Sequence, residues 1–102
     1  MLISIIVPVY NEEKSIGAFM KSLKEIKFDY GSCEVIFVDG GSTDNTFDIV
    51  KEEFFIVKSP KKGRGCQMNY GSALAKGDIL LFLHSDSVIP PDGLKYVRDA
   101  LK

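Results

Sequence analysis

The chain has 102 residues, the length of one small domain or of part of a larger one, since domains usually run from about 50 to 250 residues. Its hydrophobic fraction of 45% and charged fraction of 26% are typical of soluble globular proteins, which excludes intrinsic disorder and fibrous repeats. The net charge of −1 gives no general attraction to nucleic acid or to anionic lipid, so we expect no nucleic-acid partner. Any binding of an anion must depend on a local group of cations.

The sequence shows neither a membrane span nor a secretory signal. The longest apolar run, Ile79–Leu83, is far shorter than the roughly 18 residues that a membrane helix needs. Leu2–Val9 is apolar, but no cationic segment precedes it and acidic residues follow it, which favours a strand over a signal peptide. Cys33 and Cys66 form no C-x-x-C pair and are too few to define a disulfide framework. We therefore predict a cytoplasmic location.

The first half of the chain is predicted to form two strands, each followed by a helix. Leu2–Val7 is apolar throughout and rich in β-branched residues, which is typical of a strand covered on both faces. A helix is expected from Asn11, a good N-cap residue, because apolar residues then recur at helical spacing. Val35–Val38 is the second predicted strand, and Ser42 or Thr43 is expected to cap the helix after it.

The second half is predicted to repeat this pattern. Phe54–Val57 is the third predicted strand and Ile79–Leu83 the fourth. Between them a helix is expected over residues 65–76, and Gly77 is expected to end it in the left-handed conformation. A last helix is expected from Pro90. Three residues of the third helix are predicted to face the core: Tyr70, Ala73 and Leu74.

Strands and helices that alternate with short connections predict an α/β fold, an open parallel sheet with helices on both faces. Polar clusters follow all four predicted strands, at Tyr10–Glu12, Asp39–Ser42, Lys61–Arg64 and His84–Asp86. The carboxyl ends of parallel strands meet at the edge of the sheet where α/β proteins bind ligands, so these clusters predict one site. The sequence has no G-x-x-x-x-G-K-[ST] and no G-x-G-x-x-G after the first strand, which argues against a P-loop or a dinucleotide-binding enzyme.

Three motifs, in this order and at these spacings, resemble the nucleotide-sugar-binding half of family 2 glycosyltransferases: Val7–Glu13, Val38–Asp44 and Leu83–Asp86. The segment Gly63–Gly71 is similar to the part of that family before its metal motif. The resemblance covers essentially the whole chain and implies the A-type glycosyltransferase fold, in which a Rossmann-like nucleotide-binding half precedes an acceptor-binding half. It thus implies that residues 1–102 are the nucleotide-sugar-binding half of a truncated domain and that the acceptor-binding half is absent.

The resemblance also implies a function. The intact enzyme would move a sugar from a nucleoside diphosphate, with a UDP-sugar favoured, to an acceptor hydroxyl, with inversion and with Mn²⁺ or Mg²⁺ as cofactor. The general base of the family belongs to the later half, so we expect it beyond Lys102 and expect the chain alone not to transfer sugar. The alternatives are a non-catalytic nucleotide-binding fragment and a self-associating module that needs a partner chain, because an open sheet edge invites pairing and a homo-oligomer.

In that role, the residues after the first two strands would hold the base and the ribose. Tyr10 offers an aromatic face for stacking on a pyrimidine, or else shields the start of the helix. Glu12 is placed to contact base or ribose, or else only stabilises the helix N-terminus. In the family the residue that matches Asp39 accepts a hydrogen bond from the base; the alternative is a turn that Asp39 caps. The resemblance implies these nucleotide-sugar-binding residues: Pro8, Tyr10, Glu12, Asp39, Ser42, Arg64, His84 and Ser85.

The residues after the last two strands would hold the diphosphate and the metal. Lys58, Lys61, Lys62 and Arg64 lie close together in the chain and suit a diphosphate, or else form a solvated surface loop; Arg64, between two glycines, is the preferred contact. The segment His84–Asp86 stands where the family has its D-x-D metal motif. The resemblance therefore implies Asp86 and His84 as metal ligands, with a sugar or ribose contact as the alternative for His84. An imidazole ligand would favour Mn²⁺ over Mg²⁺.

Overall fold

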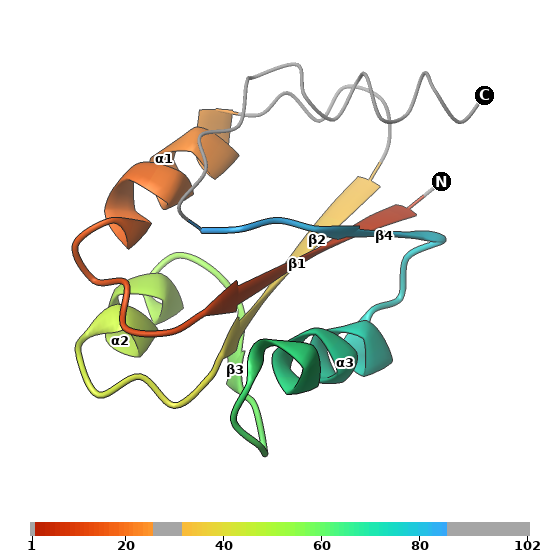
Figure 1. Cartoon of the computed structure of the whole chain (residues 1–102). Helices are drawn as coiled ribbons and strands as arrows, with labels where there is room; N and C mark the ends of the chain where they lie inside the picture. The colour runs from red at the N-terminus through yellow and green to blue at the C-terminus, as the bar shows by residue number, and fades with distance from the viewer. Residues whose placement is uncertain (1, 26–31, 86–102) are drawn as a thin grey trace.

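The structure is a computed structural model, and it describes residues 2–25 and 32–85 (Figure 1). The last predicted helix, from Pro90, lies outside the described residues. Strands and helices alternate along the described chain, as expected. Their bounds are β1 Leu2–Val9, α1 Ile16–Glu25, β2 Ser32–Asp39, α2 Thr46–Lys51, β3 Ile56–Lys58, α3 Arg64–Leu74 and β4 Ile79–Phe82.

The four strands form one parallel sheet in the order β3-β2-β1-β4. The helices α1 and α2 pack on one face of this sheet and α3 on the other (Figure 1). After β3 the chain passes back over β2 and β1 to reach β4, so the strand order reverses beside β1. Such a reversal opens a crevice outside the carboxyl ends of the strands, where α/β folds bind ligands. The predicted α/β class with helices on both faces is confirmed.

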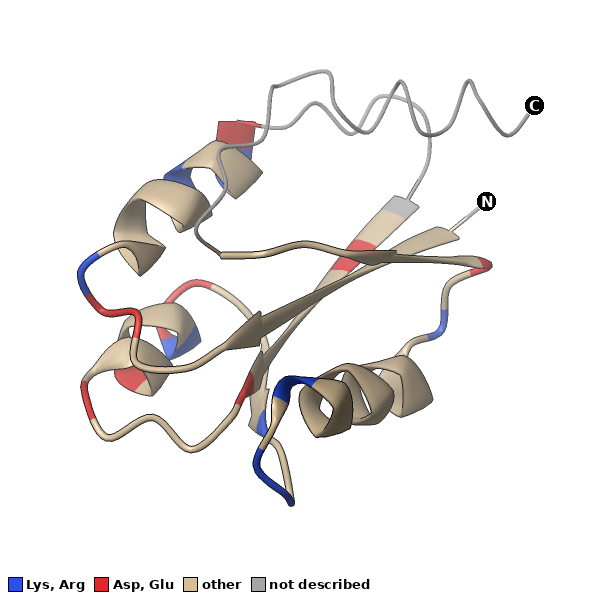
Figure 2. Cartoon of the chain, viewed as in Figure 1, with Lys and Arg blue, Asp and Glu red and all other residues tan. Residues whose placement is uncertain are grey.

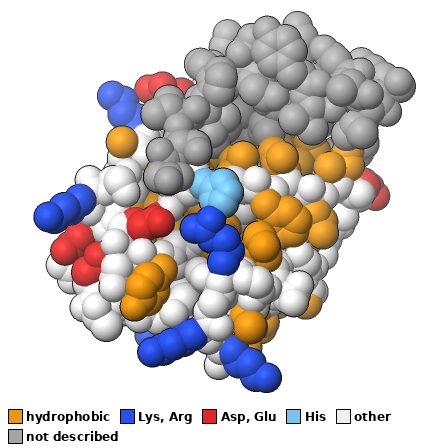
Figure 3. Space-filling model, viewed as in Figure 1, with side chains coloured by type: hydrophobic (Ala, Val, Ile, Leu, Met, Phe, Trp, Pro, Cys, Tyr) orange, Lys and Arg blue, Asp and Glu red, His pale blue; other side chains and the backbone are white. Residues whose placement is uncertain are grey.

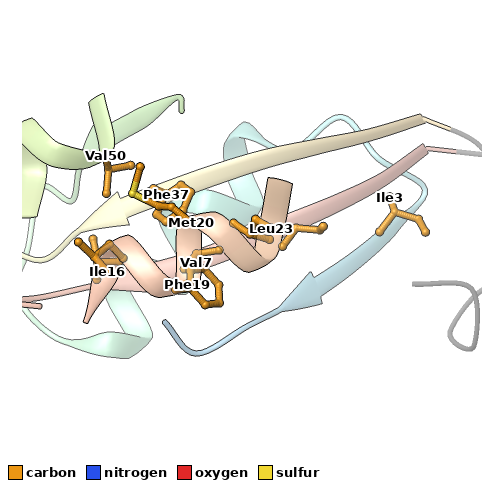
Figure 4. Close-up of a cluster of buried hydrophobic side chains, with 10 residues drawn as sticks. Ile3, Val7, Ile16, Phe19, Met20, Leu23, Phe37 and Val50 are labelled. Atoms are coloured by element: carbon orange, nitrogen blue, oxygen red, sulfur yellow. The ribbon is translucent and has the colours of Figure 1, made fainter. Parts of the chain in front are cut away.

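β1 is the central strand and is buried on both faces, as its composition predicted. Alternate side chains of a strand point to opposite faces. Val7 therefore packs with Ile16 and Phe19 of α1, in the larger hydrophobic cluster shown in Figure 4, whereas Ile6 belongs to the cluster beneath α3. Phe37 of β2 meets Phe19 edge to face, with ring centroids 6.2 Å apart. None of the helices in residues 2–25 and 32–85 combines the length and hydropathy of a membrane span.

α3 approaches the sheet closely through a glycine. A Cβ atom on Gly71 would lie 2.6 Å from Cγ2 of Ile6 and 3.0 Å from Cγ2 of Val38, so no larger residue fits without movement. Of the three residues predicted to face the core, Tyr70 is partly buried against this cluster. The prediction was wrong for Ala73, which is exposed, and for Leu74, which is 38% exposed. The face of α3 that meets the sheet carries Gly71, and the apolar side chains of Ala73 and Leu74 lie on other faces of the helix.

The predicted starts of the first two helices were wrong. α1 begins at Ile16, and Asn11 is not its cap: Asn11 has a φ of 49° and its side chain bonds to the backbone of Thr43 instead. α2 begins at Thr46, and neither Ser42 nor Thr43 caps it. In both cases the polar residues that suggested a cap instead form hydrogen bonds between the loops after β1 and β2.

The predicted end of α3 was also wrong. α3 stops at Leu74, with Ala75 as its C-cap, and Gly77 does not adopt a left-handed conformation. A Cβ on Gly77 would lie 2.7 Å from the backbone nitrogen of Ser4 and 2.9 Å from the carbonyl oxygen of Leu2. A glycine stands there because the chain enters β4 close against the start of β1.

The contact between Gly71 and the sheet can be tested by substitution. Gly71→Ala should lower the free energy of unfolding by about 1 to 3 kcal/mol, because the added methyl group overlaps Ile6 and Val38. Gly17→Ala, on an open part of α1, should instead raise it by about 0.5 to 1 kcal/mol, since alanine favours helix. Urea denaturation followed by circular dichroism measures both, and equal effects of the two substitutions would contradict the packing of α3.

Candidate functional site

A cavity of about 310 Å³ lies at the carboxyl ends of the central strands. The loops after β1, β2 and β3 meet there, together with the first turn of α3. Figure 2 shows that basic residues gather in the loop before α3 and at its start, on an otherwise nearly neutral chain. The residues that line the cavity are Tyr10, Gly40, Lys62, Gly63, Arg64 and Gln67. One wall of the cavity is therefore aromatic and another is cationic.

The aromatic wall is Tyr10, which follows directly on β1 and is 50% exposed. Large aromatic side chains usually bury most of their surface, so a half-exposed ring beside a cavity is available to stack on a flat ligand. α1 begins at Ile16. Stacking of Tyr10 on a base and its alternative role of shielding the helix start both stay predictions.

Asp39 ends β2 and is only 2% exposed. Its Oδ2 accepts hydrogen bonds from the backbone nitrogens of Gly41 and Ser42, at 3.0 and 2.9 Å, and its Oδ1 accepts one from the Ser42 hydroxyl at 2.6 Å. Gly41 has a φ of 98°, which favours glycine, so the turn depends on both residues. The turn-capping role of Asp39 is therefore present in the structure, and its contact with a base stays a prediction.

The loops after β1 and β2 are joined by hydrogen bonds. Ser42 Oγ accepts from the backbone nitrogen of Asn11 at 2.9 Å, and Asn11 Oδ1 accepts from that of Thr43 at 2.7 Å. The backbone nitrogen of Glu12 donates to Thr46 Oγ1 at 2.8 Å. Ser42 thus has a structural role beside the cavity. Like Glu12 and the buried Pro8, it does not line the cavity itself.

Asp44 organises the same pair of loops. Its Oδ1 accepts from the hydroxyl and the backbone nitrogen of Thr46, at 2.5 and 3.0 Å, and its Oδ2 accepts from the backbone nitrogen of Glu13 at 3.3 Å. The hydroxyl of Thr46 is the main cause that lowers the pKa of Asp44 below its ordinary value, and the two backbone nitrogens add to it. The ionised carboxylate therefore stabilises the arrangement of both loops.

Gln67 of α3 joins the cavity to the sheet. It is only 4% exposed, and its Nε2 donates to the carbonyl oxygens of Val9 at 2.9 Å and Val38 at 2.8 Å, which bridges the ends of β1 and β2. A Cβ on Gly40 would lie 2.9 Å from the end of the Gln67 side chain, so any side chain there would displace the Gln67 amide. Sequence reasoning assigned Gln67 no role of its own. The signal that could have indicated this role is that Gln67, a polar residue, lies one turn before Gly71 on the same face of the predicted helix.

The cationic wall contains two of the four basic residues that the sequence singled out. Lys62 and Arg64 line the cavity. Lys58 instead lies over the ring of Phe47, with its Nζ 4.8 Å from the centroid, and is directed toward α2. Arg64 opens α3, directly after Gly63, which has a φ of 110°. The first turn of α3 and two cations thus line the same cavity, which favours an anionic ligand.

Arg64 also meets the segment that follows β4. Its Nη1 lies 2.8 Å from Nδ1 of His84, and Figure 3 shows the pale blue histidine against a basic side chain on the surface. Ser85 is buried, and within residues 2–25 and 32–85 its hydroxyl has no hydrogen-bond partner. Asp86, the predicted metal ligand, lies outside the described residues. Of the two predicted metal ligands, His84 is therefore the one within the described residues. These residues contain no group of three metal-ligating side chains.

The comparisons with known proteins identify the family. The family model described as "Glycosyl transferase family 2" matches residues 4–102. The chain belongs to this family. The resemblance read from the three motifs is thereby confirmed.

Related proteins support this membership. The undecaprenyl-phosphate 4-deoxy-4-formamido-L-arabinose transferase of Pseudomonas fluorescens is 32% identical over 113 aligned residues, which cover 98% of this chain and 32% of that protein. The structure of Staphylococcus aureus TarS 1-349 in complex with UDP is 33% identical with a TM-score of 0.86, over 97% of this chain and 31% of that one. The structure of the Pyrobaculum calidifontis mannosyltransferase in complex with GDP-Man and Mn²⁺ is 26% identical with a TM-score of 0.82. The match covers 90% of this chain and 30% of that one. The chain spans about a third of the length of these similar proteins.

The bridge made by Gln67 yields one prediction. Gln67→Met should lower the free energy of unfolding by about 1 to 3 kcal/mol, because two buried carbonyl oxygens lose a donor while the volume is nearly kept. Asn69→Met, on the exposed side of the same helix, is the control and should change stability little. Chemical denaturation of both variants tests this, and a fully stable Gln67→Met chain would mean that the bridge contributes nothing.

The lowered pKa of Asp44 yields a second prediction. Because its pKa is lower in the folded chain than in the unfolded one, its contribution to stability is present above the ordinary value of 3.8 and is lost as pH falls through the folded pKa. The difference in stability between the natural chain and Asp44→Asn should therefore shrink on acidification below about pH 4. Urea midpoints over this range measure it, with Asp48→Asn, an exposed position of α2, as control. A difference that does not change with pH would exclude this role.

Proposed function

We propose that this chain binds a nucleoside diphosphate sugar, as the donor-binding part of a glycosyltransferase that moves the sugar to an acceptor hydroxyl with inversion. The cavity between Tyr10 and the start of α3 carries this proposal. Its volume of about 310 Å³ is at the lower end of the range of small-molecule sites. An aromatic ring and two cations in one lining match a ligand that has both a flat ring and an anionic group.

The two walls suggest how the ligand lies. The base would stack on Tyr10, and a UDP-sugar is the favoured ligand since the similar TarS structure holds UDP. The diphosphate would lie against Lys62, Arg64 and the backbone N–H groups that open α3, where the helix dipole favours negative charge. Asp39 would accept a hydrogen bond from the base, with Pro8, Glu12 and Ser42 supporting it from the adjoining loops.

A divalent cation, Mn²⁺ or Mg²⁺, completes the proposal. The similar mannosyltransferase structure contains Mn²⁺ with its GDP-sugar. The buried, unpartnered hydroxyl of Ser85 shows that polar capacity is left unused at this end of the sheet among the described residues. Asp86 would hold the metal, which neutralises the charge that develops on the departing diphosphate.

Several parts of the proposal concern the whole protein. Residues 1–102 would form the nucleotide-sugar-binding half of a longer domain, with the general base and the acceptor site beyond Lys102. The predicted self-association has one supporting observation, because Leu80 and Phe82 on β4 are exposed. A cytoplasmic location stays a prediction of the sequence.

Calorimetric titration with UDP tests the proposal. Tyr10→Ala should weaken UDP binding by about 1 to 3 kcal/mol, the usual value for loss of a stacked base. Phe55→Ala, which removes an exposed aromatic ring that does not line the cavity, should leave the affinity unchanged. Uridine without phosphate should bind more weakly than UDP because it lacks the contacts with the cationic wall. A folded chain that binds UDP no better than uridine, or that is indifferent to Tyr10→Ala, would contradict this function.

A further inference from the structure

The contact between Arg64 and His84 joins two segments that are distant in the chain. Arg64 is the first residue of α3, and His84 follows the end of β4. Arg64 Nη1 and His84 Nδ1 are 2.8 Å apart, and both side chains are exposed at the surface. Arg64 also lines the cavity. The imidazole of His84 therefore contacts the guanidinium of a residue that also lines the cavity.

The chemistry of the two groups determines the direction of this hydrogen bond. A guanidinium has only donors, so Nδ1 of His84 must accept. A neutral imidazole has a single nitrogen lone pair in its plane, and the other nitrogen carries the proton. Arg64 thus occupies the lone pair of His84, and the proton is on Nε2. In this state His84 has no lone pair left for a metal ion.

We propose that His84 is a positioning residue for Arg64 and is not a ligand of the divalent metal. This inference rests on the proposed function, since it assigns Arg64 to the diphosphate. An exposed arginine loses much rotamer freedom when it binds a ligand. The bond to His84 holds the guanidinium in place beforehand, so less of that freedom remains to be lost.

The first arm of the test measures UDP affinity without metal, in the presence of EDTA. Arg64→Met and His84→Ala should each weaken binding by about threefold to tenfold, and the double variant should be no weaker than Arg64→Met alone, because coupled residues are not additive. His84→Asn keeps an acceptor oxygen near the place of Nδ1 and should restore the affinity. Lys62→Met is the matched control, since it removes a cation from the same wall, and its effect should add to that of His84→Ala.

The second arm measures Mn²⁺ binding in the presence of UDP by electron paramagnetic resonance. His84→Asn should keep the Mn²⁺ affinity within about twofold, the ordinary error of additivity, whereas Asp86→Asn should lose it. Loss of Mn²⁺ in the His84→Asn variant, or additive effects of Arg64→Met and His84→Ala, would overturn the inference. If the natural chain binds UDP but His84→Ala does so equally well, the positioning role alone fails. If the natural chain binds no UDP, the proposed function fails with it.

Discussion

The position of β1 is the constraint on which the rest of this structure depends. It pairs with β2 on one edge and with β4 on the other, and its side chains are buried on both faces. A strand enclosed in this way has its backbone groups satisfied by neighbouring strands, so the sheet determines where the strand ends in space. Tyr10 follows directly from that end, and Gln67 bonds to the carbonyl oxygen of Val9 there.

The cavity follows from how α3 packs on this strand. Gly71 lets the helix approach the sheet, and Gln67, one turn earlier, reaches the ends of β1 and β2. This packing of α3 also places its first turn, with Arg64, at the crevice beside β1. Close packing in the middle of the helix therefore determines where its N-terminal charge lies. Gly40 is part of this arrangement, because any side chain there would displace Gln67.

Side chains with structural roles surround the cavity as closely as those with proposed roles in binding. Asp39, Ser42 and Asp44 use their oxygen atoms to hold the loops after β1 and β2. Polar residues at the edge of a sheet thus serve two purposes: they satisfy the backbone of irregular loops, and they present a few groups to a ligand. Tyr10 and Arg64 are both exposed and both line the cavity, so we assign them to the second kind in the proposed function.

The amino-acid sequence by itself determined the alternation of strands and helices, the burial of β1 and the edge at which polar residues collect, because these follow from local periodicity and from the direction of parallel strands. It also carried the motifs that place the chain in its family. Only the tertiary structure decided which residues meet. Asn11 looked like a helix cap and Gly77 like a helix end, yet each is required by a neighbouring segment distant in the chain. The bridge of Gln67 and the bond between Arg64 and His84 depend on how α3 lies across the sheet, which no local pattern encodes.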